Sequence, residues 1–131
     1  MTDLSWIKDL SHFHGTDYYH RFSPLWGSVL TDGAKFLAEK AGAFWLFDTI
    51  ESHIRERVRR TGLDFDVSFV CSTLKCDLDT GNGELTLDNG NKKIIAVQSI
   101  EYTDFPLPFF ELFAKWYRPV DGWVHMLPSE Y

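Results

Sequence analysis

The sequence lacks any uninterrupted apolar stretch that approaches the length of a membrane span. Its first residues also lack the cationic segment followed by an apolar run that is typical of a secretory signal. Cysteine is scarce, because only Cys71 and Cys76 are present. Side chains five positions apart on a strand point to opposite faces, which disfavours a disulfide or a shared metal. We therefore expect a cytoplasmic protein with reduced thiols and no membrane partner.

The standard catalytic and phosphate-binding motifs are also missing. There is no G-x-S-x-G turn, no glycine-rich phosphate loop and no HExxH pair, and the five histidines show no zinc-binding spacing. The acidic loop 77–83 fits a calcium loop poorly, because Gly81 offers no side-chain oxygen and Asn82 stands where glycine is needed. We predict no metal and no cofactor, assign no catalytic residue, and favour a protein that is not an enzyme.

The chain is instead rich in apolar and aromatic side chains, which make up 44% and 16% of its 131 residues. These fractions exclude disorder, and the length fits a single domain over residues 1–131. Asp and Glu outnumber Lys and Arg by 19 to 13, which gives a net charge of -6. Because a negative surface repels a phosphate backbone at long range, we do not expect nucleic acid as the main partner.

Residues 1–62 show mainly helical patterns. Apolar spacing predicts a short helix within residues 3–14, with Asp3 as its cap. A second helix is expected after Thr31-Asp32-Gly33, with the Thr31 hydroxyl or the Asp32 carboxylate as its cap, and Gly42 is expected to interrupt it. The ring-rich segment between these helices has no clean period and is interpreted as an irregular connection.

The strongest helix prediction covers residues 43–60, where apolar residues recur every three or four positions and form one stripe. Glu51 and Arg55 are spaced for an ion pair on the outer side of this helix. Phe44 and Trp45 fall off the stripe, so the ring-rich N-terminal segment or a partner must cover them.

From residue 63 the period changes to two, which predicts mainly strands over residues 63–131. The first strand is expected over residues 63–73. One of its faces is the more apolar and carries Leu63, Phe65, Val67, Phe69, Cys71 and Thr73. The acidic turn 77–83 follows it.

Four further strands are expected after this turn. Glu84–Asp88 and residues 92–103 flank Asn89-Gly90, the sharpest hairpin signal in the chain. For Phe109–Tyr117 a strand is favoured over a short helix, and a last strand is expected over Trp123–Leu127. This order predicts an α+β fold, with N-terminal helices packed on one face of a four- to five-stranded antiparallel meander sheet.

Several polar side chains lie in ring-rich loops, where binding and catalytic groups tend to occur. They come from three segments: Tyr18, Tyr19, His20 and Arg21; Asp32; and Asp104. The favoured interpretation is that the carboxylates cap helices and brace turns. If the loops converge, His20 or Asp104 would serve as a general base beside the cation of Arg21. His53 and His125 are expected to face solvent.

Five segments resemble an uncharacterised family of small bacterial, plasmid and phage proteins, catalogued as a domain of unknown function. They are Gly15–Tyr19, Leu30–Glu39, Ala41–Asp48, Tyr102–Pro108 and Leu127–Tyr131, and the likeness runs roughly from Gly15 to Tyr131. The resemblance implies a setting among mobile elements, where small acidic proteins often act by binding host proteins. It supplies no catalytic residue.

The leading hypothesis is a non-enzymatic interaction or accessory protein, with an anti-defence factor of a mobile element as one version and nucleic-acid mimicry by acidic side chains as another. Its partner would be a protein encoded by the host or the element. The candidate binding residues are Tyr18, Tyr19, His20, Arg21, Asp32, Phe44, Trp45 and Asp104. The alternative is a small enzyme or ligand-binding domain built on His20, Arg21, Asp32 and Asp104. A third hypothesis is a homodimer formed through ring-rich surfaces.

Overall fold

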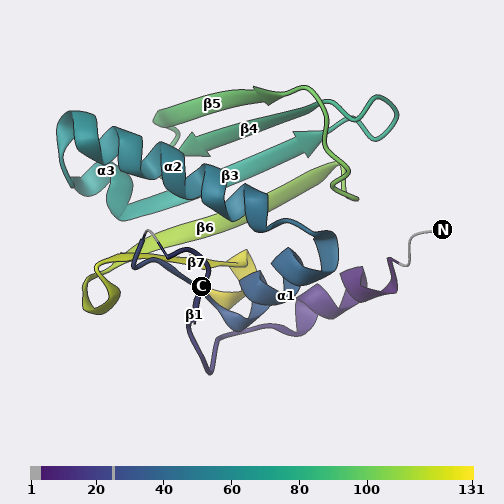
Figure 1. Ribbon diagram of the computed structural model, residues 1–131, viewed down its shortest axis with the longest axis horizontal. Helices are drawn as coiled ribbons and strands as arrows, with labels where there is room; N and C mark the ends of the chain where they lie inside the picture. The colour runs from purple at the N-terminus through teal and green to yellow at the C-terminus, as the bar shows by residue number, and fades with distance from the viewer. Residues whose placement is uncertain (1–3, 25) are drawn as a thin grey trace.

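The computed structural model describes residues 4–24 and 26–131 and shows an α+β fold (Figure 1). Its helical elements are η1 (Ser5–His12), α1 (Asp32–Ala41), α2 (Phe44–Thr61), α3 (Phe65–Ser68), η2 (Arg118–Val120) and η3 (Pro128–Glu130). Its strands are β1 (His20–Arg21), β2 (Val29–Leu30), β3 (Phe69–Cys76), β4 (Gly83–Asp88), β5 (Ile94–Ile100), β6 (Phe109–Tyr117) and β7 (Gly122–Met126). Across these two ranges, no helix combines the length and apolar character needed to cross a membrane.

The strands form one sheet in the order β1-β2-β7-β6-β3-β4-β5, as far as the described residues go. The expectation of a four- to five-stranded antiparallel meander is therefore wrong. Seven strands are present, and β2 pairs with β7 in parallel. The additional strands β1 and β2 have two residues each, too short to show a period. In a meander, β6 would pair with the preceding strand β5. It pairs instead with β3 and β7.

Local signals placed several elements correctly. The Thr31 hydroxyl accepts a hydrogen bond from the Ala34 backbone at 3.2 Å, and α1 ends at Gly42 with a φ of 61°. The hairpin at Asn89-Gly90 and the strand assignment of β6 are confirmed. The helix within residues 3–14 is present as the 3-10 helix η1, and its expected cap, Asp3, lies outside the described residues.

The predicted strand over residues 63–73 begins six positions late, at Phe69. The Asp64 carboxylate accepts a hydrogen bond from the Asp66 backbone at 3.0 Å and caps the short helix α3, so a local cap overrides the alternating pattern. The expected faces are also exchanged in the strand that remains. Its best-buried side chains include Val70 and Leu74, while Phe69 and Thr73 are only half-buried.

Helical cover is not confined to one face of the sheet, contrary to expectation. The α2 side chains, including Phe47 and Ile50, share the main core with Val70 of β3. On the other face of β3, the ring of Tyr131, which follows η3, packs against Phe69 with a centroid distance of 5.1 Å. The chain after β7 thus returns to cover part of the face that the N-terminal helices leave open.

At Gly122, β7 comes close to the chain before β2. A Cβ atom on Gly122 would lie 2.6 Å from the backbone nitrogen of Ser28. Real Cβ atoms do not come this close to backbone, so a larger residue would push the two strands apart.

We predict that Gly122→Ala lowers the free energy of unfolding by about 1–3 kcal/mol, because overpacking at a backbone contact forces the strands to shift. The matched control is Gly15→Ala, where an added Cβ meets nothing within 4 Å. Urea unfolding of both variants provides the measurement. An equal loss of stability in the two variants would contradict the role of the Gly122 contact.

Candidate functional site

A buried polar network joins α2 to β7. Glu51, expected on the outer side of α2, has no exposed surface. Its Oε1 lies 2.7 Å from His125 Nε2, and its Oε2 accepts hydrogen bonds from Ser28 Oγ at 2.8 Å and Arg55 Nε at 2.7 Å. The predicted pair of Glu51 and Arg55 is therefore present, but it faces inward. Burial alone raises the pKa of Glu51, and the hydrogen bonds and charges of these partners outweigh it, so the pKa is lowered overall.

His125 is also fully buried, and the expectation that it faces solvent is wrong. All residues of β7 are buried. An alternating pattern therefore cannot predict which side chains of this strand face solvent. The rings of Phe22 and Phe47 meet the imidazole edge-on at 5.4 and 5.8 Å. A carboxylate only accepts, so Nε2 carries the hydrogen that Glu51 receives. The side chains of His125 and Glu51 are both withdrawn from solvent.

The structure brings two of the predicted loop residues together. His20 Nε2 lies 2.7 Å from Asp32 Oδ1, and Asp32 Oδ2 accepts a hydrogen bond from the Asp17 backbone at 2.9 Å. The hydrogen bond with His20 and then the one with Asp17 lower the pKa of Asp32. The ring of Tyr18 lies 6.4 Å from that of His20. This cluster ties the first connection to the start of α1.

The other two residues of that hypothetical catalytic group make different contacts, although Arg21 directly follows His20 in β1. Arg21 donates to the carbonyl of Trp26 at 3.3 Å. Asp104 lines a hollow with Trp45 and Tyr102, and none of the loop residues around His20 contributes to it. Phe44 stays 41% exposed at the start of α2. The eight predicted site residues are thus divided between separate regions of the surface.

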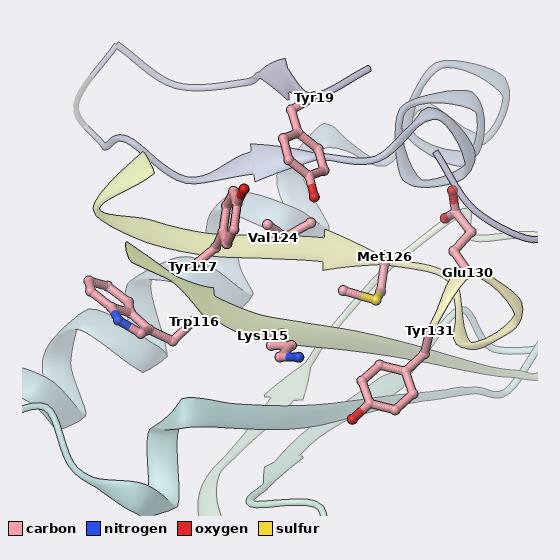
Figure 2. Close-up of a pocket in the computed structure, with 8 residues that line it drawn as sticks. All are labelled: Tyr19, Lys115, Trp116, Tyr117, Val124, Met126, Glu130 and Tyr131. Atoms are coloured by element: carbon pink, nitrogen blue, oxygen red, sulfur yellow. The ribbon is translucent and has the colours of Figure 1, made fainter. Parts of the chain in front are cut away.

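A groove of about 310 Å³ crosses β6 and β7 (Figure 2). We call it the tyrosine groove; its lining residues are Tyr19, Lys115, Trp116, Tyr117, Val124, Met126, Glu130 and Tyr131. Tyr19 meets Tyr117 edge-on at 5.6 Å, and the ammonium of Lys115 lies 5.8 Å from the centre of the Tyr131 ring. Figure 2 shows Val124 and Met126 on β7 between these rings. The groove therefore has an apolar floor and a rim of tyrosines.

Glu130 fixes one end of this groove. Its carboxylate accepts hydrogen bonds from the Thr31 hydroxyl at 2.6 Å, the Gly33 backbone at 3.0 Å and the Leu127 backbone at 3.0 Å. The acidic group therefore stabilises the N-terminus of α1 and holds η3 beside it. Of the groove residues, the sequence predicted only Tyr19. The others come from strand positions and from η3, and no local pattern shows that these segments meet.

Two features of the described residues, 4–24 and 26–131, bear on what a metal site or a reactive thiol requires. No group of three or more His, Cys, Asp or Glu side chains in these ranges is placed to hold a metal ion. Burial raises the pKa of the Cys71 thiol to about 12, and the nearby Glu111 carboxylate adds to the shift. A thiol with this pKa stays protonated at neutral pH and is a poor nucleophile.

Comparison with protein-family models identifies a family for this chain. The model of a family of unknown function, DUF6876, matches residues 5–131. The chain belongs to this family. No curated protein and no solved structure matches the chain. Membership in DUF6876 confirms the expected uncharacterised domain and assigns no role to any residue.

We predict that acid destabilises this protein partly through Glu51. Its pKa in the folded state is lowered from the ordinary value of 4.5. The resulting stability is fully present above pH 4.5 and is lost as the pH falls through the lower, folded-state pKa. Glu51→Gln should cost about 3 kcal/mol at pH 7, because His125 and Arg55 lose their anion.

The measurement is urea unfolding of the parent and of Glu51→Gln between pH 7 and pH 3. The difference between the two proteins should shrink as the pH falls. Glu39→Gln is the control, because Glu39 is exposed and forms a surface ion pair of 3.7 Å with Lys35. A pH-independent difference between the parent and Glu51→Gln would contradict the assignment of this carboxylate as ionised.

Proposed function

We propose that this member of DUF6876 is a non-enzymatic interaction protein that binds a partner protein through the tyrosine groove. The observation that carries the proposal is the gathering of Tyr19, Tyr117 and Tyr131 around one apolar floor. These rings are 47%, 39% and 70% exposed. Aromatic side chains and methionine, which make up most of the groove lining, are enriched in protein interfaces.

The way the rings are held also supports binding of a protein segment. Tyr117 belongs to β6, which is paired with strands on both sides, and Tyr131 packs against Phe69 and Phe113. A preorganised aromatic side chain loses little conformational entropy on binding. The floor of Val124 and Met126 would take apolar side chains of the partner, while tyrosine hydroxyls at the rim would bond to its backbone.

An enzyme using His20, Arg21, Asp32 and Asp104 has less support. General acid–base catalysis needs its groups within hydrogen-bond reach of one substrate. Only His20 and Asp32 lie together, and Asp104 lines a hollow to which they do not contribute. We therefore keep the interaction protein as the proposal, with a cytoplasmic partner encoded by a host or a mobile element, and an anti-defence role as its narrower form.

The proposal predicts site-dependent cross-linking in cells. A photoreactive phenylalanine analogue placed at Tyr19 or Tyr117 should capture the same partner protein. At Phe65, which is 81% exposed on α3 and does not line the groove, it should not. Capture of the same proteins with equal yield from position 65 would count against a specific interface.

Binding of the purified partner should then depend on the groove. Tyr117→Ala should weaken the complex about tenfold or more, which corresponds to about 1.4 kcal/mol, because a buried tyrosine is a typical interface hot spot. Tyr18→Ala is the matched control, since Tyr18 is 69% exposed and lies outside the groove lining. Isothermal titration calorimetry measures both affinities. Equal effects of the two substitutions would contradict the proposal.

A further inference from the structure

A second aromatic feature lies where the loop between β3 and β4 meets the segment that follows β5. Tyr102 is 72% exposed, yet its ring is in contact with the backbone of Gly81. A Cβ atom on Gly81 would come within 2.6 Å of the ring, and the φ of this residue is 81°. The Thr103 backbone donates to the Gly81 carbonyl at 2.7 Å, which fixes the two segments together. The ring is therefore supported from one side and stands out of the surface.

Two hollows border this ring. The first, of about 290 Å³, is lined by Trp45, Ile100, Tyr102, Thr103 and Asp104. The second, of about 410 Å³, also includes Tyr102, Thr103 and Asp104 and extends to Asp79 of the acidic loop. Tyr102 and Asp104 thus contribute to both hollows, with Trp45 in one and Asp79 in the other.

The charge of these hollows has one sign. Among the residues that the structure describes, the charged side chains that line them are Asp104 in both and Asp79 in one, and no lysine, arginine or histidine does so. Asp104 is exposed, and within the described part of the chain it forms neither an ion pair nor a side-chain hydrogen bond. An aromatic face beside an unpaired carboxylate attracts a cation through both the ring quadrupole and the charge.

We propose that the two hollows bind the cationic side chains of a basic polypeptide. A guanidinium group would stack on Tyr102 or Trp45 and pair with Asp104, a combination that suits arginine because its planar group both stacks and forms paired hydrogen bonds. Two hollows that share one ring fit two cations carried on one chain better than a single free cation. The net charge of -6 adds long-range attraction to such a segment.

This site is separate from the tyrosine groove, and its test does not require the unidentified partner. The probe is the acetylated and amidated peptide Arg-Ser-Arg, and the neutral control is the same peptide with citrulline in place of arginine. Citrulline keeps the shape of arginine and removes its charge. NMR titration follows the indole N–H signal of Trp45, assigned by its loss in Trp45→Phe.

The arginine peptide should shift the Trp45 signal to saturation, and the citrulline peptide should bind at least tenfold more weakly. Asp104→Asn should weaken the arginine peptide about tenfold. Asp121→Asn is the matched control, because it removes the same charge in the turn before β7, where its φ of 52° suits asparagine. An unchanged spectrum elsewhere checks that each variant is folded.

Three results would overturn the proposal. One is equal binding of the arginine and citrulline peptides, or no saturable shift with either. Another is an equal loss with Asp104→Asn and Asp121→Asn, which would indicate unspecific attraction to a negative protein. The third is acetyl-arginine amide binding as tightly as the two-arginine peptide, which would assign the hollows to a free small cation.

Discussion

The carboxylate of Glu51 is the constraint on which the packing of this fold depends. It is withdrawn from water at the centre of α2, where an unpaired charge would be strongly destabilising. Three donors on different segments offset that cost: His125 on β7, Ser28 before β2 and Arg55 one turn along the helix. These three hydrogen bonds therefore tie the helix, the last strand and the N-terminal connection to one another.

This arrangement extends beyond the carboxylate itself. The Ser28 hydroxyl accepts a hydrogen bond from the Trp123 backbone at 2.8 Å, and the Trp123 indole donates to the Val67 carbonyl of α3 at 2.7 Å. The Arg55 guanidinium lies over the same indole at 5.1 Å. Strand β7 is thus fixed on its inner side by polar contacts. Its outer side, with Val124 and Met126, is free to serve as the floor of the tyrosine groove.

The parts of the fold that could be predicted from sequence are those with local causes. The apolar stripe of residues 43–60 predicts helix α2, and the capping residues at 31–32 predict the start of α1. The Asn89-Gly90 turn predicts the hairpin of β4 and β5. What could not be predicted depends on distant partners. The spacing of Glu51 and Arg55 is typical of an ion pair on a helix surface. Nothing near Glu51 in the sequence shows that His125 is a further partner.

The surface sites also depend on contacts between segments that are distant in sequence. Tyr19 and Asp104 were predicted as binding residues from their loop setting, and Trp45 because it falls off the apolar stripe of its helix. The alternative hypothesis required His20, Arg21, Asp32 and Asp104 to share one site. Tyr117 and Tyr131 were missed, because their meeting with Tyr19 depends on the long-range pairing that places β7 beside β2. Some exposed rings, such as Tyr19 and Phe44, could therefore be identified from sequence, whereas the grouping of rings from distant segments could not.

The two proposed binding surfaces are connected by one strand. Asp104 lies shortly before β6 begins at Phe109, and Tyr117 of the tyrosine groove is the last residue of that strand. At about 3.3 Å per residue, β6 separates its ends by roughly 26 Å. Because β6 is paired on both sides, this separation is fixed. A partner that uses both surfaces must therefore reach past both ends of β6, whereas two smaller partners would bind to separate sets of residues.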